Sequence, residues 1–297
     1  MKSNPQVLCV GSVLWDIIGR TDRAMIQGND VAGRISRLPG GVAMNIAMAL
    51  GGMGIKVALL TAVGADAEGE ELLAAAERLG LDTRCVHTAT GFPTDRYMAI
   101  ESGGNLVAAT ADAHTLEAAG DKILAPLLDG RLASRDKPFC GMVAIDGNLT
   151  ETMLAHIATS DLFKAADVRV APASPGKAGR LGAFLGHARA TLYVNLFEAN
   201  TLTGRSDSRT IDAAAVLRRK GLGRALVTDG ANAASLASSR GVCAFTPPRI
   251  TARRVTGAGD VLMATHMAAE LGGMDEEAAL ESAIRRAADY VASEEPL

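Results

Sequence analysis

Short apolar runs and longer helix-like segments alternate along most of this chain. The apolar runs at 6–11, 56–64 and 139–146 are rich in Val, Leu and Ala. Such runs are typical of strands that are buried on both faces of a parallel sheet. Segments with a helical pattern, at 42–54 and 68–80, follow the first two runs. This order predicts an α/β fold with a doubly wound, mostly parallel sheet.

The same alternation continues through the second half of the chain. Further strand-like runs lie at 167–172, 191–195 and 224–230, and helical patterns lie at 151–166 and 212–221. No internal repeat or low-complexity linker interrupts the alternation. We therefore expect residues 1–297 to form a single domain.

Two segments depart from this rhythm, and they predict a second, smaller sheet. Residues 13–38 and 95–110 mix polar and apolar positions and contain Gly-rich turns, as half-exposed antiparallel strands do. Ligands of open α/β sheets bind beyond the carboxyl ends of the main strands. We expect the two segments to pair there as a lid, and the exposed edges of such a lid predict a homodimer.

Composition and net charge limit the classes of molecule that this protein is expected to bind. The chain is 48% hydrophobic and 21% charged with a net charge of -3, which argues against disorder and against a nucleic-acid binder. The four cysteines are scattered singly, without metal-ligand spacing, as expected in a reducing cytoplasm. The apolar run near the start is too short for a membrane span. A small-molecule partner is the default expectation.

The stretch TGAGD, residues 256–260, carries the strongest chemical signal. Gly257, Ala258 and Gly259 precede an apolar helical pattern, and Asp260 follows them directly. Unpaired N–H groups at a helix N-terminus bind anions such as phosphate, and small residues allow a close approach. A carboxylate beside that site is suited to accept a proton from an attacking hydroxyl. The alternative is an ordinary turn with a helix cap.

A second polar motif lies in PGGVAMN, residues 39–45. Its glycine pair stands four positions before Asn45, which lies in an apolar helical segment. The pair is suited to let a polar ligand approach the backbone, and the Asn45 amide to bind ligand hydroxyls. A flexible turn before a capped helix is the alternative.

Together, these motifs resemble those of the ribokinase-like, or PfkB, carbohydrate kinase family. The resemblance extends to VLCVGSVLWD at 7–16 and VNLFEANTLTG at 194–204. It implies a three-layer α/β/α fold with a β-sheet lid, and transfer of phosphate from MgATP to a primary hydroxyl of a sugar or nucleoside. It also implies that Asp260 is the base and that the N–H groups of Gly257, Ala258 and Gly259 hold the transferred phosphoryl group.

The family pattern assigns the remaining site residues in two groups. By resemblance, the residues that hold the hydroxyls of the acceptor are Asp16, Gly41 and Asn45. Those that position ATP are Asn195, Glu198, Thr228 and Gly230, with Glu198 holding Mg²⁺, usually through water. A solvent-facing charge at Asp16, an exposed helix residue at Glu198 and an unremarkable strand residue at Thr228 are the structural alternatives.

Within the family, the motifs are most similar to those of the pseudouridine kinase subgroup. PGGVAMN, RRVTGAGD and VAPASPGK all resemble that subgroup, and Lys177 matches a lysine expected to contact substrate or phosphate. Arg254 stands where many relatives have an aspartate that helps hold a monovalent cation, which calls activation by such a cation into question. Ala171 stands where the subgroup usually has aspartate.

Other activities stay open at this point. The acceptor could be ribose, fructose, 2-keto-3-deoxygluconate or another nucleoside, and a non-catalytic binding protein is a further alternative. A dinucleotide-dependent oxidoreductase is disfavoured because no G-x-G-x-x-G follows the first strand-like run.

Overall fold

A large sheet with helices on both faces forms the body of the protein. The computed structural model describes residues 4–103 and 105–293, so Gly104 of the predicted lid turn lies outside the described part. The eight strands of the sheet are, in spatial order, β14 (Gly241–Phe245), β13 (Asn232–Ser238), β12 (Arg224–Asp229), β11 (Thr191–Asn195), β10 (Asp167–Ala171), β9 (Met142–Asp146), β1 (Val7–Val10) and β4 (Val57–Leu60). Neighbouring strands from β4 to β12 run parallel. Only the last two pairs, at the β14 edge, are antiparallel.

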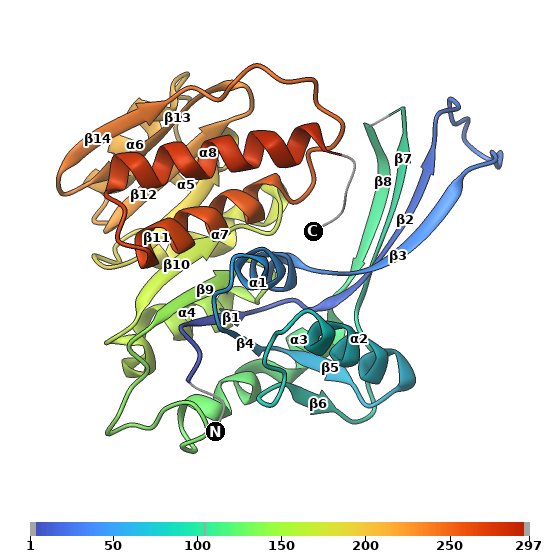
Figure 1. The fold of residues 1–297 in the computed structure, drawn as a ribbon, viewed down its shortest axis with the longest axis horizontal. Helices are drawn as coiled ribbons and strands as arrows, with labels where there is room; N and C mark the ends of the chain where they lie inside the picture. The colour runs from blue at the N-terminus through green and yellow to red at the C-terminus, as the bar shows by residue number, and fades with distance from the viewer. Residues whose placement is uncertain (1–3, 104, 294–297) are drawn as a thin grey trace.

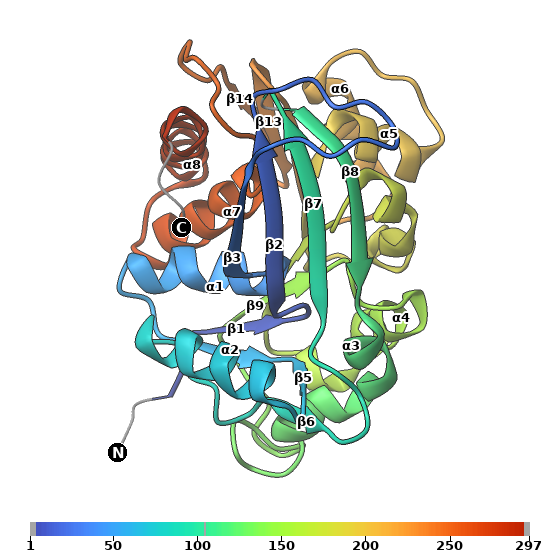
Figure 2. The same ribbon diagram turned by 90° about the vertical axis from the view of Figure 1, so that its right-hand side faces the viewer.

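Two layers of helices cover this sheet (Figure 2). One layer consists of α1 (Val42–Gly52), α2 (Ala67–Arg78), α7 (Ala258–Leu271) and α8 (Glu276–Ala292). The other consists of α3 (His114–Ala119), α4 (Glu151–Thr159), α5 (Leu196–Thr203) and α6 (Thr210–Arg219). Each layer buries its own apolar cluster against the sheet. The predicted three-layer, doubly wound fold is thereby confirmed.

Short 3₁₀ helices interrupt the regular pattern at η1 (Gly120–Leu127), η2 (Asp161–Phe163) and η3 (Pro175–Phe184). The helix predicted over 151–166 was too long, because α4 ends at Thr159. The Ser160 hydroxyl accepts a hydrogen bond from the N–H of Leu162 and begins a separate 3₁₀ turn. Serine favours such local bonds over a continuing helix.

The two irregular segments form a separate four-stranded sheet, here called the lid sheet. Its order is β3 (Arg34–Gly40), β2 (Leu14–Thr21), β7 (Arg96–Ser102) and β8 (Asn105–Asp112). It stands away from the body as a tall, curved layer (Figure 1). The strands were predicted to be antiparallel, and the pairs β2–β3 and β7–β8 are, but β2 and β7 at the centre run parallel. This arises because the chain passes through the body, including the short parallel pair β5 (Ala62–Gly64) and β6 (His87–Ala89), before it returns to the lid.

Candidate active site

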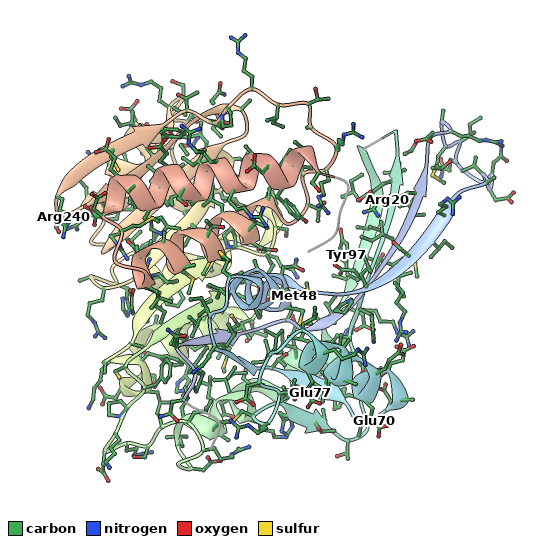
Figure 3. All side chains as sticks on the ribbon, in the orientation of Figure 1. Arg20, Met48, Glu70, Glu77, Tyr97 and Arg240 are labelled. Atoms are coloured by element: carbon green, nitrogen blue, oxygen red, sulfur yellow. The ribbon has the colours of Figure 1, made fainter. Side chains whose placement is uncertain are left out.

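A cleft of about 500 Å³ lies between the lid sheet and the carboxyl ends of the main strands. Tyr97 lines this cleft from the lid, on the face of the lid sheet that points toward the body (Figure 3). Most residues singled out from the sequence line this cleft, namely Asp16, Gly41, Asn45, Lys177, Asn195, Glu198, Thr228, Gly257, Gly259 and Asp260. Ala258 and Gly230 are not among the lining residues. Residues from both ends of the sequence therefore meet in one place.

Asn45 and Asp260 form the polar centre of the cleft. They lie on α1 and α7, which pack against each other. The Asn45 Nδ2 donates a hydrogen bond of 2.9 Å to Asp260 Oδ2. Burial raises the pKa of Asp260 to about 7, the Asn45 bond opposes this rise, and the negative charges of Asp146 and Asp16 add to it. A carboxyl group with this pKa exchanges protons near neutral pH, as a general base requires.

The start of α7 supplies N–H donors beside Asp260. Gly257 caps the helix in the left-handed conformation, with φ of 84°. The Ala258 N–H donates to the carbonyl oxygen of Val255 at 3.2 Å and is engaged in that turn. Gly259 and Asp260 follow within the first helical turn, where N–H groups have no partner in the helix. Gly259 and Asp260 thus supply the donors suited to an anion in this conformation, whereas the anion-binding role predicted for all three small residues stays a prediction.

The glycine pair before α1 is explained by contacts within the protein. A Cβ atom on Gly40 would lie 2.1 Å from Asp16 Oδ2. One on Gly41, whose φ is 95°, would lie 2.5 Å from the carbonyl oxygen of Ser12. Gly40 therefore leaves room for the Asp16 carboxylate, and Gly41 lets the chain pass over Ser12 into the helix. From the sequence, the glycine pair was predicted to leave space for a ligand. In the structure, part of that space is taken up by the Asp16 side chain.

Asp16 reaches the cleft from the lid sheet. It lies on β2 opposite Tyr97 of β7 and Leu38 of β3. Burial raises the pKa of its carboxyl group to about 6. Since Asp16 belongs to the lid and Asn45 and Asp260 belong to the body, a ligand that contacts all three must lie between the two sheets.

Asn195 and Glu198 form a reciprocal helix cap at the start of α5. The Asn195 side chain accepts a hydrogen bond from the Glu198 N–H at 2.9 Å, and Glu198 Oε2 accepts one from the Asn195 N–H at 2.8 Å. Such a capping box gives the N-x-x-E pattern a structural purpose of its own. Burial raises the pKa of Glu198. Within the described part of the chain, its second carboxylate oxygen makes no hydrogen bond or ion pair, and the residue lines the cleft together with Thr228.

A buried polar network beneath the cleft was not predicted. Asp146 is fully buried at the end of β9, and its Oδ2 accepts hydrogen bonds from the backbone N–H and the hydroxyl of Ser12. The Ser12 hydroxyl also accepts from Asn148 Nδ2 at 3.1 Å, and Asn148 Oδ1 accepts from Lys177 Nζ at 2.8 Å. Lys177 is thereby held at the cleft wall next to Asn148. The position of Asp146 at the end of an apolar strand was the signal in the sequence.

Charged and polar groups also fix α7 against the sheet. His266 of α7 is fully buried and bonds Tyr193 of β11, with 2.8 Å between Nδ1 and the hydroxyl. Four residues later, Glu270 forms ion pairs with Arg169 of β10 and Arg224 of β12. These contacts set the height and rotation of the helix that carries Asp260.

The donor set fits a phosphate chain with its magnesium ion better than a metal held by protein alone. Within the described ranges 4–103 and 105–293, no group of three or more His, Cys, Asp or Glu residues is placed to hold a metal. Mg²⁺ commonly keeps several waters and binds one or two carboxylates together with phosphate oxygens. Glu198 offers one such carboxylate at the cleft wall.

Comparison with known proteins agrees with this chemistry. A model described as the pfkB family carbohydrate kinase matches residues 4–295. The pseudouridine kinase of Escherichia coli strain K12 is 30% identical over 281 residues, covering 92% of this chain and 86% of that protein. A carbohydrate kinase from Agrobacterium tumefaciens superposes with a TM-score of 0.79 at 28% identity, over 97% of this chain and 91% of the other.

A more distant structure shares the same fold. An Escherichia coli protein described as a ribokinase II, in complex with ATP and Mg²⁺, superposes with a TM-score of 0.79 at 16% identity, over 98% and 94% of the two chains. The oxidoreductase alternative is thereby set aside, and the resemblance found in the motifs is confirmed. The chain belongs to the PfkB family of carbohydrate kinases and is an ATP-dependent sugar or nucleoside kinase.

Proposed function

We propose that this kinase transfers the γ-phosphoryl group of ATP to the 5′-hydroxyl of pseudouridine. The observation that carries the proposal is the pairing of Asn45 with Asp260 opposite Asp16, between lid and body. The 30% identity with a pseudouridine kinase supports the choice of acceptor.

The Asp260 carboxylate and the groups around it suggest how the phosphoryl group is transferred. The 5′-hydroxyl oxygen forms a bond to the γ-phosphorus while the bond from that phosphorus to the bridging oxygen of ADP breaks. The hydroxyl proton passes to the Asp260 carboxylate, whose pKa of about 7 suits this role. The backbone N–H groups at the start of α7 stabilise the negative charge on the phosphoryl oxygens. Asp16 and Asn45 hold the ribose hydroxyls so that the 5′-hydroxyl lies beside the Asp260 carboxylate.

We propose that the nucleobase of the acceptor lies toward Asn148 and Lys177. The Asn148 amide both donates and accepts hydrogen bonds, and Lys177 donates. Pseudouracil offers two N–H groups and two carbonyl groups, a set that matches these side chains. Tyr97 and Ala171 line the same cleft and supply apolar surface for the ring.

The donor nucleotide is proposed to lie along Asn195, Glu198 and Thr228, with Gly230 in the hairpin turn after β12. Glu198 would hold the Mg²⁺ through water, since its Oε2 is already engaged by the Asn195 N–H. Bound Mg²⁺ offsets the charge of the phosphate oxygens. Asn195 meanwhile keeps the Glu198 carboxylate at the cleft wall.

The enzyme is further proposed to be a cytoplasmic homodimer joined through the lid sheets. Three apolar side chains on the lid face opposite Asp16 are exposed, Ile35 by 80%, Met98 by 54% and Ile100 by 36%. Neighbouring exposed apolar residues are typical of protein interfaces.

The proposed cytoplasmic location rests on the cysteines. All four are free thiols, which supports a reducing compartment. No helix in the described part of the chain has the length and apolar character needed to cross a membrane.

The acceptor is tested by measuring ATP consumption with Mg²⁺ and a panel of acceptors. The panel contains pseudouridine, uridine, adenosine, ribose, fructose and 2-keto-3-deoxygluconate, and Asp260→Asn is the control. Selective turnover of pseudouridine is expected. Preference for a simple sugar would overturn the acceptor and keep the family chemistry.

A further inference from the structure

The loop that leads into α7 is tied to the end of α8. The backbone N–H groups of Arg253 and Arg254 both donate to the carbonyl oxygen of Val291, at 2.9 and 3.3 Å. Val291 lies in the last turn of α8, two residues before the helix gives way to Ser293. The loop before the phosphate-binding turn therefore rests on the C-terminus of a neighbouring helix.

Arg254 strengthens this tie with its side chain. Its guanidinium carbon lies 3.9 Å from the centre of the Tyr290 ring, and its Nε donates to the Tyr290 carbonyl oxygen at 3.1 Å. A cation over an aromatic face is attracted by the ring, and a cation at the last carbonyls of a helix is favoured by the helix dipole. Both effects act on Arg254 in the same place.

Tyr290 passes the contact on to the start of α7. Its hydroxyl donates to the Thr256 carbonyl oxygen at 3.1 Å. The same hydroxyl lies 2.7 Å from the position that a Cβ atom on Gly257 would take. Gly257 is therefore needed for two reasons, its φ of 84° and the room it leaves for Tyr290. The hydroxyl therefore contacts Thr256 and Gly257, which a single residue separates from Gly259 and Asp260, whose N–H groups are the proposed donors.

We propose that Arg254 and Tyr290 are positioning residues for the phosphoryl-binding N–H groups, with Arg254 acting as a built-in cation at the base of the loop. Neither Arg254 nor Tyr290 is among the residues that line the cleft. The pair holds Thr256 and Gly257 so that the first N–H groups of α7 point into the cleft before ligand binds. Donors fixed in advance stabilise developing charge without reorganisation. The inference rests on the proposed function, both for the phosphoryl-binding role of the first N–H groups of α7 and for the choice of acceptor in the assay.

The kinetic test uses Arg254→Ala and Tyr290→Phe, assayed with the best acceptor of the panel. Because small misplacements of catalytic groups are costly, we expect Arg254→Ala to lower kcat about tenfold or more, with the acceptor KM within about twofold. Tyr290→Phe keeps the ring beneath Arg254 and loses only the bond to Thr256, so its loss should be smaller. Millimolar guanidinium chloride should restore part of the Arg254→Ala activity, and sodium chloride should not.

Arg285→Ala is the matched control. Like Arg254, Arg285 lies over an aromatic ring, with its guanidinium carbon 5.1 Å from the ring centre of Phe245. It lies on α8 and pairs with Glu281 of the same helix, and neither residue lines the cleft. Its loss should leave kcat unchanged. Equal effects of the two arginine variants, or a kcat of Arg254→Ala within twofold of the unaltered enzyme, would overturn the proposal.

Hydrogen–deuterium exchange supplies a readout that needs no acceptor. In Arg254→Ala, the segment 253–262 should exchange faster while the middle of α8 stays protected, and Arg285→Ala should exchange like the unaltered protein. Unchanged exchange in 253–262 would refute the positioning role even if no acceptor were turned over. Failure of the acceptor panel with the unaltered enzyme would instead count against the proposed function alone.

Discussion

Asp260 combines a raised pKa with one side-chain hydrogen-bond donor among the described residues, Asn45. A base acts on the proton while the phosphoryl group moves, so its removal affects the transition state more than ground-state binding. We expect Asp260→Asn to lower kcat by about a thousandfold, within the range of general-base catalysis, with ATP affinity nearly unchanged. Turnover is measured with the best acceptor and affinity by calorimetry. Asp289→Asn, an exposed change on α8, is the control, and substantial turnover by Asp260→Asn would contradict the assignment.

The pH profile tests the link between Asn45 and Asp260. The base must be deprotonated, so kcat/KM should rise with pH through the Asp260 pKa of about 7. The Asn45 amide stabilises the carboxylate form, because it donates to Oδ2. Asn45→Ala should therefore move the rising limb of the profile to higher pH, in addition to raising the acceptor KM. A limb that stays in place would show that the bond does not tune the base.

Gly40 tests the space around Asp16. In Gly40→Ala, the new methyl group would overlap the Asp16 carboxylate, which lies 2.1 Å from that position. The flexible carboxylate should move away, and the acceptor KM should rise about tenfold for this misplacement. Gly52→Ala at the end of α1 meets nothing within 4 Å and is the matched control. Equal KM values for the two variants would argue against a role of Asp16 in acceptor binding.

At the level of elements, we expect the capping box of α5 to have two separable roles, a helix cap and a magnesium contact. Glu198→Gln keeps an oxygen for the Asn195 N–H, so the helix cap should survive while the charge is lost. The Mg²⁺ concentration for half-maximal rate should rise about tenfold, the scale of lost indirect metal contacts, without a lower melting temperature. Asn195→Ala should instead lower the free energy of unfolding by about 1 kcal/mol. If both variants have a lower melting temperature and an unchanged Mg²⁺ dependence, Asn195 and Glu198 serve only to cap the helix.

Sequence patterns predicted elements better than their pairing. Buried strands such as 191–195 carry their own apolar signature, and TGAGD marks the start of α7 within two residues. The parallel pairing of β2 with β7 depends on how the chain returns from the body, which no local pattern records.

The candidate site divides in the same way. Asp260 and Asn45 stand in glycine-rich motifs, whereas Asp146 and Ser12 are joined only by folding, across 134 positions of sequence. The capping box also shows that the pattern N-x-x-E, assigned from sequence to the nucleotide site, serves local structure.

At the level of the whole molecule, the lid sheet predicts the oligomeric state. A pair of lids in contact would cover Ile35, Met98 and Ile100. We expect light scattering to give twice the 30.6 kDa mass of one chain. Met98→Glu should give single chains because it buries a charge in that contact. Arg240→Glu, at the far end of the body from the lid, should not (Figure 3). A single-chain mass for the unaltered protein would remove the dimer.

The Asn45–Asp260 bond joins residues 215 positions apart, and this separation matters during protein synthesis. Chains fold from the N-terminus as they leave the ribosome. The lid and Asp16, Gly41 and Asn45 are made within the first 112 residues, long before α7. On the proposed mechanism, a ribosome-bound chain that has not reached residue 260 therefore carries Asp16, Gly41 and Asn45 but lacks the proposed base. If Asp260 is the base, we expect phosphoryl transfer to begin only after nearly all of the chain has been made.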